Sequence, residues 1–235
     1  MLIKQSLPLL LLLSLGAFIC VESKDLEKDF GNLARYRDSS LQLASLSRGS
    51  NLVVFMGDSI TDWWPKSGNF FPGKKYVGRG IAGQTTPQML LRFQQDVINL
   101  KPRVMVILAG TNDLNRETGN DCETIEGNLQ RMVALSRANN IKVVLATILP
   151  VCGKQVKKRP PAKISEINAW IKNYCEKTGV VYLDYYSAMV GSDGLMRQEL
   201  AGDCLHPNAI GYEIMAPLAE KAIQQALQPP ERIII

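Results

Sequence analysis

Four short runs of apolar residues stand out along the chain, and each is followed directly by glycine, proline or aspartate. None of the runs shows the apolar and polar alternation of a half-exposed strand. An unbroken apolar run of this length is typical of a strand that is buried on both faces. The sequence therefore predicts four central strands, at residues 52–56, 104–109, 143–149 and 180–183.

Between these runs lie stretches in which apolar residues recur every three or four positions, a spacing that places them on one face of a helix. The predicted helices span residues 87–99, 123–139, 164–177 and 208–227, the last with Asn208 as its N-cap. Residues 25–48 are more polar, with apolar side chains at helix-compatible spacing, and predict one or two surface helices.

Strands that alternate with helices predict parallel βαβ units with right-handed crossovers. The pattern has no internal repeat and no break in composition, so we expect residues 24–235 to form one α/β domain. A chain of 235 residues with 46% hydrophobic and 21% charged residues is long enough, and ordinary enough, for such a core. The net charge of +5 is too small to indicate a nucleic-acid partner.

The N-terminus resembles a targeting segment. An apolar run follows Lys4 and is too short to span a bilayer comfortably. Val21 and Ser23 then fit the small-residue rule for a cleavage site. We expect residues 1–23 to be a signal peptide, and the protein to be secreted or periplasmic without stable membrane insertion. A lipid anchor on Cys20 and an uncleaved anchor are the alternatives.

Four cysteines follow this leader: Cys122, Cys152, Cys175 and Cys204. An even number in an exported chain permits two disulfides, for which three pairings exist, and is equally compatible with buried thiols. Neither a Cys-x-x-Cys pair nor a His-Glu-x-x-His motif occurs, so we expect no metal and no cofactor.

The first two predicted strands lead directly into polar segments, which begin at Gly57-Asp58-Ser59 and at Gly110-Thr111-Asn112. In parallel sheets, ligands bind beyond the carboxyl ends of the strands. Ser59 would open a helix, where its own backbone N–H has no helical partner. With a base beside it, Ser59 can act as a nucleophile; the alternative is that it only caps the helix.

His206 is the only histidine of the chain, so a histidine-rich metal site is excluded by count. Any hydrolase that uses a histidine base would have to use this one. Asp203 lies three residues earlier, a spacing that lets its carboxylate reach the imidazole Nδ1–H and leaves Nε2 for a serine. The sequence thus predicts a triad of Ser59, His206 and Asp203.

These segments resemble the characteristic blocks of the GDSL, or SGNH, hydrolases, in the order that the family has them. The matching segments are Gly57-Asp58-Ser59-Ile60, Gly83, Gly110-Thr111-Asn112-Asp113 and Asp203-x-x-His206-Pro207. Within that family, the chain is similar to acylhydrolases related to platelet-activating-factor acetylhydrolase.

The resemblance implies a flavodoxin-like, three-layer α/β/α fold with about five parallel strands. It also implies an oxyanion hole made of the backbone N–H groups of Ser59 and Gly83 and the side-chain amide of Asn112. One departure is Cys204, at a position where glycine is common in the family; a disulfide there would brace the catalytic loop.

The predicted activity is serine-dependent hydrolysis of small or short-chain acyl esters through an acyl-enzyme. A carbohydrate O-acetylesterase with the same triad is one alternative, and a non-catalytic lipid- or glycan-binding protein is another. The segment 78–83 also matches the dinucleotide fingerprint Gly-x-Gly-x-x-Gly, but no acidic residue ends a strand about 20 residues later, which argues against a nicotinamide enzyme.

Three further features lie near the predicted site. Trp63 and Trp64 cannot share one helix face, so we expect one to pack inside and the other to border the acyl pocket, unless both are ordinary core or surface aromatics. Asp58 and Asp113 are expected to be structural and to bond loop backbone. The basic residues 154–161 predict a solvated connection, with contact to an anionic substrate as the alternative.

Overall fold

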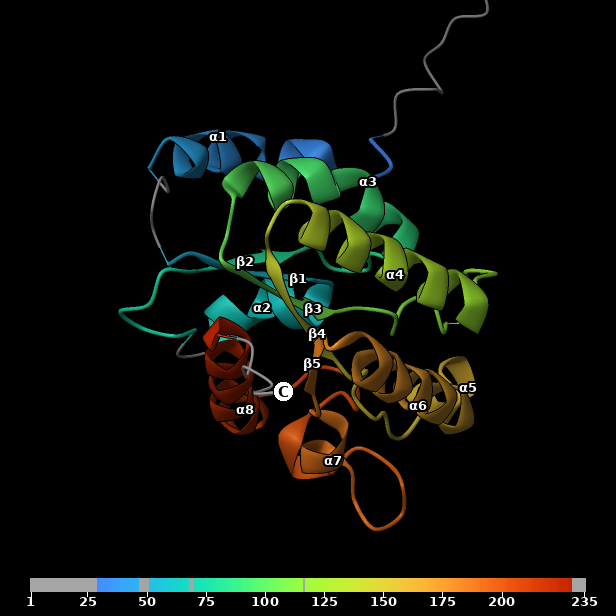
Figure 1. The fold of residues 1–235 in the computed structure, drawn as a ribbon. Helices are drawn as coiled ribbons and strands as arrows, with labels where there is room; N and C mark the ends of the chain where they lie inside the picture. The colour runs from blue at the N-terminus through green and yellow to red at the C-terminus, as the bar shows by residue number, and fades with distance from the viewer. Residues whose placement is uncertain (1–28, 47–50, 68–69, 116, 230–235) are drawn as a thin grey trace, which may run out of the picture.

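A computed structural model describes residues 29–46, 51–67, 70–115 and 117–229. Its five strands form one parallel sheet in the order β2-β1-β3-β4-β5 (Figure 1). The strands are β1 (Val53–Gly57), β2 (Tyr76–Gly80), β3 (Val104–Leu108), β4 (Lys142–Ala146) and β5 (Val181–Leu183). The expected three-layer α/β/α fold is confirmed. The predicted signal peptide, residues 1–23, lies outside the described residues.

All four predicted strands are present, and the largest difference is at β4, which ends at Ala146 rather than at residue 149. The chain leaves the sheet at Thr147, whose Oγ1 accepts hydrogen bonds from the backbone N–H groups of Tyr185 and Tyr186. Residues 147–149 are buried because the loop that follows β4 packs inward. The prediction ran too far because the buried residues of this loop continue the pattern of the buried strand.

Helices cover both faces of the sheet. On one face pack α3 (Thr86–Asp96), α4 (Cys122–Ala138) and α6 (Pro161–Thr178), and on the other α2 (Ser59–Ser67) and α8 (Ala209–Leu227). Figure 1 shows α3 and α4 above the sheet and α2 and α8 below it. Shorter or more peripheral elements complete the described chain: α1 (Arg37–Leu46), α5 (Gln155–Lys158), α7 (Tyr186–Met189) and 3-10 turns at Leu33–Tyr36, Ile98–Leu100 and Gln198–Leu200.

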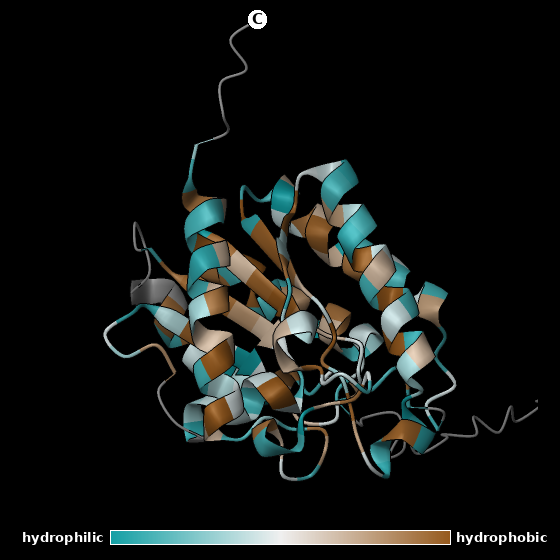
Figure 2. Ribbon diagram, turned by 90° about the horizontal axis from the view of Figure 1, so that it is seen from below, coloured by the Kyte–Doolittle hydropathy of each residue, from teal (hydrophilic) through white to brown (hydrophobic). Residues whose placement is uncertain are grey.

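The strands contribute alternate side chains to two cores. In β1, Val54 and Met56 face the core beneath α3 and α4, whereas Val53 and Phe55 face the core beneath α2 and α8. Figure 2 shows the resulting pattern on the helices, whose hydrophobic faces turn toward the sheet and whose hydrophilic faces turn outward. Burial on both faces explains why these strands read as continuous apolar runs.

The carboxyl ends of β1 and β2 approach each other closely. The Ile81 N–H donates to the Gly57 carbonyl over 3.2 Å. At Gly80, an added Cβ would lie 2.1 Å from the Asp62 backbone nitrogen, so only glycine fits against the first turn of α2. This contact brings the turn after β2 beside the start of α2, which is where the polar motifs of the sequence meet.

The last helix begins as expected, with the Gly211 N–H donating to Asn208 Oδ1 over 3.0 Å. Among the described residues, no helix combines the length and the apolar character needed to cross a bilayer.

Candidate active site

The three residues of the predicted triad lie in contact at the carboxyl end of the sheet. Ser59 Oγ is 2.8 Å from His206 Nε2, and His206 Nδ1 is 2.6 Å from Asp203 Oδ2. An ionised carboxylate can only accept hydrogen bonds, so Nδ1 carries the proton and Nε2 presents its lone pair to the serine hydroxyl. Residues 147 positions apart therefore form the geometry that a general base and a nucleophile need.

The Asp203 carboxylate is held by its own turn. Its Oδ1 accepts the backbone N–H of Leu205 over 3.0 Å and that of His206 over 2.7 Å. Partial burial acts to raise the pKa of Asp203, but the hydrogen bonds from His206 and Leu205 outweigh it and hold the pKa below its usual value. The group facing the imidazole is therefore a carboxylate anion across the neutral pH range.

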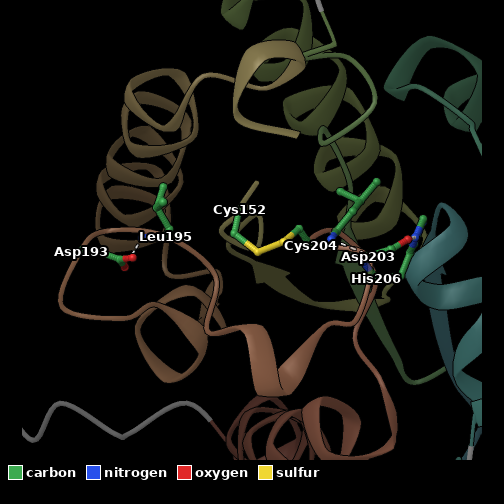
Figure 3. Close-up of a disulfide and its surroundings, with 7 residues drawn as sticks. Cys152, Asp193, Leu195, Asp203, Cys204 and His206 are labelled. Carbon is green, nitrogen blue, oxygen red and sulfur yellow. Dashed lines mark hydrogen bonds and ion pairs between the residues drawn. A yellow bond between two sulfur atoms is a disulfide. The ribbon is translucent and has the colours of Figure 1, made fainter. Parts of the chain in front are cut away.

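A disulfide joins the turn that carries Asp203 and His206 to the segment after β4. Figure 3 shows the bond between Cys152 and Cys204, with Asp203 and His206 beside Cys204. The Cys152 N–H also donates to the Cys204 carbonyl over 3.1 Å. Cys204 has a φ of 65°, in the left-handed region that glycine adopts without cost.

This bond answers the question that the cysteine count left open. The other two cysteines, Cys122 and Cys175, are buried free thiols. Burial raises the pKa of Cys175 to about 12, which keeps that thiol protonated and unreactive. The disulfide considered at Cys204 is present and ties down the loop that carries Asp203 and His206, and only one of the two possible disulfides forms among the described residues.

Ser59 is the first residue of α2, so its backbone N–H points out of the helix start. The hydroxyl bonds His206, whereas Asp58 Oδ1 accepts the Ile60 N–H over 2.9 Å. The capping bond at this helix start thus comes from Asp58 and not from the serine hydroxyl. The alternative role of Ser59 as a mere helix cap is therefore wrong.

Asp58 is fully buried, and its Oδ2 has no hydrogen-bond partner among the described residues. Burial, with help from the charge of Asp113, raises the pKa of Asp58 to about 7, against the opposing effects of the Ile60 N–H and Arg159. The structural role expected for Asp113 is also confirmed, since its carboxylate accepts the backbone N–H and the hydroxyl of Thr86 at the start of α3.

The two other predicted oxyanion donors lie on neighbouring loops. Gly83 occupies a turn with a φ of 80°, and Gln84 follows it. The Asn112 side chain, on the loop after β3, donates one amide N–H to the Gln84 carbonyl over 3.0 Å. Its second N–H remains for a ligand, because a primary amide has two. The structure therefore places the Asn112 amide beside the Gly83 turn.

The segment before α1 supports the same turn from outside. Gln84 Nε2 donates to the Gly31 carbonyl over 2.8 Å, and Gln88 Nε2 donates to the Phe30 carbonyl over 3.0 Å. The part of the chain that directly precedes the fold is thus bonded to the loop that carries Gly83.

A buried arginine that the sequence did not reveal ties the strand ends together. Arg92 has no exposed surface, and it donates to the carbonyls of Arg79 and Gly57 over 2.9 and 3.0 Å. Its charge is balanced by Asp96 at 3.1 Å, one helical turn away in α3. Arg92 also bonds the Gln84 side chain, so one guanidinium holds the ends of β1 and β2 and the Gly83 turn.

A second arginine holds the loop after β3. Arg159 donates to the Thr111 carbonyl over 2.9 Å and to Asn112 Oδ1 over 3.1 Å, which fixes the direction of the Asn112 amide. Only 6% of Arg159 is exposed, so the prediction of a fully solvated connection at residues 154–161 is wrong at this position. No local sequence signal marks this role, because Thr111 and Asn112 lie 48 and 47 positions away.

The tryptophan pair divides as the helix geometry requires. Trp64 is 2% exposed and stacks on Tyr212, with ring centroids 5.0 Å apart. Trp63 is 37% exposed, and its ring lies 4.1 Å from that of His206. The expectation that one indole packs inside is confirmed, and the other borders the imidazole of the candidate site.

Comparisons with known proteins agree with this geometry. The profile of the GDSL-like Lipase/Acylhydrolase family matches residues 55–214, more than half of the chain. A putative acylhydrolase from Bacteroides fragilis NCTC 9343 is 41% identical; the match covers 86% of this chain and 100% of that one, with a TM-score of 0.81. A GDSL-like lipase from Bacteroides thetaiotaomicron VPI-5482 is 38% identical, with 84% and 100% covered and a TM-score of 0.79.

A human relative lies further away in sequence. Platelet-activating factor acetylhydrolase IB subunit alpha2 from Homo sapiens is 30% identical over 190 residues, which cover 76% of this chain and 79% of the relative. The family match, these relatives and the shared fold lead to one conclusion: the chain belongs to the GDSL-like lipase/acylhydrolase family, whose members are hydrolases that act on ester bonds.

Proposed function

We propose that the protein is a serine esterase in which Ser59 is the nucleophile, His206 the general base and Asp203 the residue that orients the imidazole. The observation that carries this proposal is the 2.8 Å contact between Ser59 Oγ and His206 Nε2, with Asp203 on the opposite ring nitrogen. The membership in a family of ester hydrolases supports it.

The reaction proceeds in two halves. His206 Nε2 takes the hydroxyl proton as Ser59 Oγ attacks the ester carbonyl carbon, and a tetrahedral oxyanion forms. When this intermediate collapses, the imidazolium returns the proton to the leaving oxygen, an alcohol departs, and the acyl group stays on Ser59. Water then attacks the acyl-enzyme with its proton passing to His206, and the second collapse releases the acid and restores the serine. Asp203 stabilises the imidazolium in both halves.

The negative oxygen of each intermediate needs hydrogen-bond donors that are already in place. We assign the backbone N–H groups of Ser59 and Gly83 and the second side-chain N–H of Asn112 to this role. Loss of one such donor typically lowers kcat about 100- to 1,000-fold. Asn112→Ala should therefore lower kcat by this factor, with a smaller effect on KM, because the charge develops after substrate binding.

The proposed substrate is a small or short-chain acyl ester. The human relative is named as an acetylhydrolase, which favours a small acyl group. An O-acetylated carbohydrate is the second candidate, and the position of Trp63 favours it. A partly exposed indole face beside His206 is a surface on which the apolar face of a sugar ring can pack.

The first experiment compares the wild type with Ser59→Ala on p-nitrophenyl acetate, with Ser39→Ala as a control that removes an exposed serine hydroxyl distant in sequence from the triad. We expect Ser59→Ala to fall to the background rate and Ser39→Ala to retain the wild-type rate. Equal rates for the wild type and Ser59→Ala would reject the esterase proposal in favour of a non-catalytic lipid- or glycan-binding protein.

A substrate panel separates the two esterase candidates. Acetate release from acetyl-xylan is compared with cleavage of acetate, butyrate and octanoate esters of p-nitrophenol. A higher kcat/KM on the acetylated polysaccharide, lost in Trp63→Ala but retained on p-nitrophenyl acetate, would favour the carbohydrate esterase.

The proposal includes export through a leader at residues 1–23, with residues 24–235 forming a single hydrolase domain. N-terminal sequencing of protein from the extracellular or periplasmic fraction should give a start near Lys24. Recovery of a chain that still begins with Met1 from that fraction would contradict cleavage.

A further inference from the structure

A cavity of about 420 Å³ opens directly beside the candidate catalytic centre. It is lined by Asn115, Lys154, Gln155, Lys158, Arg159 and Leu205. Leu205 immediately precedes His206, and Arg159 is bonded to Asn112. The cavity is therefore lined by residues of the loop that carries the proposed oxyanion donor and of the turn that carries the proposed base.

The lining of this cavity is cationic. It contains Lys154, Lys158 and Arg159 and no carboxylate. Lys158 pairs with Glu117 at 3.1 Å, outside the lining, in a contact that is half exposed to solvent. The Lys154 ammonium group makes no hydrogen bond or ion pair with any residue that the structure describes. At least one full positive charge at the cavity thus lacks a protein counter-ion among the described residues.

The third cation is fixed in place by neutral groups. Arg159 uses Nε on the Thr111 carbonyl, one terminal nitrogen on Gln155 Oε1 and the other on Asn112 Oδ1. A guanidinium has five N–H donors, so two are left over after these three bonds. Burial lowers the pKa of Arg159, while more distant carboxylates, Asp58 first, act against that shift. A buried cation bonded only to neutral oxygens gains most from an anion that enters beside it.

We propose that this cavity is a subsite for an anionic group, a carboxylate or a phosphate, carried by the ester that the protein hydrolyses. Lys154 supplies the long-range charge, and the remaining Arg159 donors supply directed hydrogen bonds. The inference rests on the proposed esterase function and adds to it the chemical class of substrate. It also gives the basic segment 154–161 the substrate contact that its sequence offered as an alternative to simple solvation.

The test compares charged and neutral esters of the same shape. For an anion on the leaving group, the substrates are 4-acetoxybenzoate, 4-acetoxyphenyl phosphate and neutral methyl 4-acetoxybenzoate. For an anion on the acyl group, they are monoethyl adipate and neutral diethyl adipate. The variants are Lys154→Gln and Lys154→Glu, each with a matched control, Lys157→Gln and Lys157→Glu. Lys157 is exposed on α5, the short helix that Lys154 directly precedes, but does not line the cavity, so it reports the general effect of lost positive charge.

We expect Lys154→Gln to raise KM for at least one anionic ester about three- to fivefold, with a larger rise in Lys154→Glu, and to leave kcat/KM for the neutral partner unchanged. The Lys157 variants should change neither substrate by more than about twofold. The difference should shrink in 0.5 M NaCl, because the Debye length is then only about 4 Å. A KM increase in Lys154→Gln that is confined to the anionic member of one substrate set supports the proposal. If it occurs only with the leaving-group set or only with the acyl set, it also shows which end of the ester enters the cavity.

Equal KM changes in the Lys154 and Lys157 variants, or an effect of Lys154→Gln on each neutral ester as large as its effect on the anionic partner, would overturn the subsite. Failure of the esterase proposal is a different result, because the wild type would then cleave neither the charged nor the neutral ester above the rate of Ser59→Ala.

Discussion

Removal of the disulfide between Cys152 and Cys204 should weaken both the fold and the turn that carries the proposed catalytic residues Asp203 and His206. The bond closes a loop between residues 52 positions apart. In the chain-entropy treatment, closing a loop of this length lowers the entropy of the unfolded chain and so raises its free energy by about 4 kcal/mol. Cys152→Ser should therefore lower the free energy of unfolding by up to about 4 kcal/mol, measured by urea denaturation of the oxidised proteins.

The backbone at Cys204 adds a second effect that is separate from loop closure. Cys204 has a φ of 65°, which costs about 1 kcal/mol for a residue with a Cβ and little for glycine. Cys204→Ser loses the disulfide and keeps the strained backbone, whereas Cys204→Gly loses the disulfide and relieves that strain. We expect Cys204→Gly to be more stable than Cys204→Ser by about 1 kcal/mol.

The same bond positions Asp203 and His206, so its loss should also lower kcat for p-nitrophenyl acetate at temperatures where the variants stay folded. Dithiothreitol should reproduce the loss of stability in the wild type and leave Cys152→Ser unaffected. The reasoning would be refuted if Cys152→Ser and the wild type unfolded at the same urea concentration, or if Cys204→Gly were no more stable than Cys204→Ser.

Three further predictions concern residues that support the site. The folded state holds a proton on Asp58 up to about pH 7 and the unfolded state only up to about pH 4, so this contribution to stability is lost as pH rises between those values. Between pH 5 and pH 8, the unfolding free energy of the wild type should therefore fall by about 3 kcal/mol more than that of Asp58→Asn. Parallel curves of unfolding free energy against pH would contradict this. Arg159→Met should lower kcat about 10- to 100-fold with little change in KM for a neutral ester, because the Asn112 amide loses its fixed direction. Arg159→Lys should retain part of the activity, and an unchanged kcat in Arg159→Met would show that Asn112 needs no such support. Gly80→Ala should lower the melting temperature by several degrees or prevent folding, because the added Cβ would overlap the Asp62 backbone nitrogen. A melting temperature equal to that of the wild type would mean that the end of β2 can move away from α2.

The central strands could be predicted because burial on both faces leaves a signal within five consecutive residues. The edge strand β2 carries a weaker signal, since Tyr76 and Val77 are only half buried and polar residues flank them. Its place in the sheet is set by pairing with β1, from Val53 opposite Tyr76 to Gly57 opposite Gly80. Such pairing is not written in the local sequence, which offered only a short, polar-flanked strand around Tyr76 and Val77, and the count of about five strands came from the family resemblance.

The candidate triad could be predicted for a different reason. A single histidine leaves one possible base, and Asp203 lies close enough in sequence to fix its orientation. Gly83 came only from the family resemblance, because a glycine in a turn has no chemical signature of its own. Arg92 and Arg159 could not be found, since a buried arginine has the same sequence appearance as an exposed one until its distant acceptors are known.

The bonding of the early segment to the Gly83 turn has a practical consequence for anyone who purifies or immobilises the enzyme. Because the Phe30 and Gly31 carbonyls hold Gln88 and Gln84 beside that turn, an affinity tag that displaces these two residues would loosen the support of the Gly83 turn. The other end of the described chain is safer. Gln228 and Pro229 border a surface hollow together with Val143 and Val181, near the amino ends of β4 and β5, so a tether there leaves the opposite rim open to bulky esters.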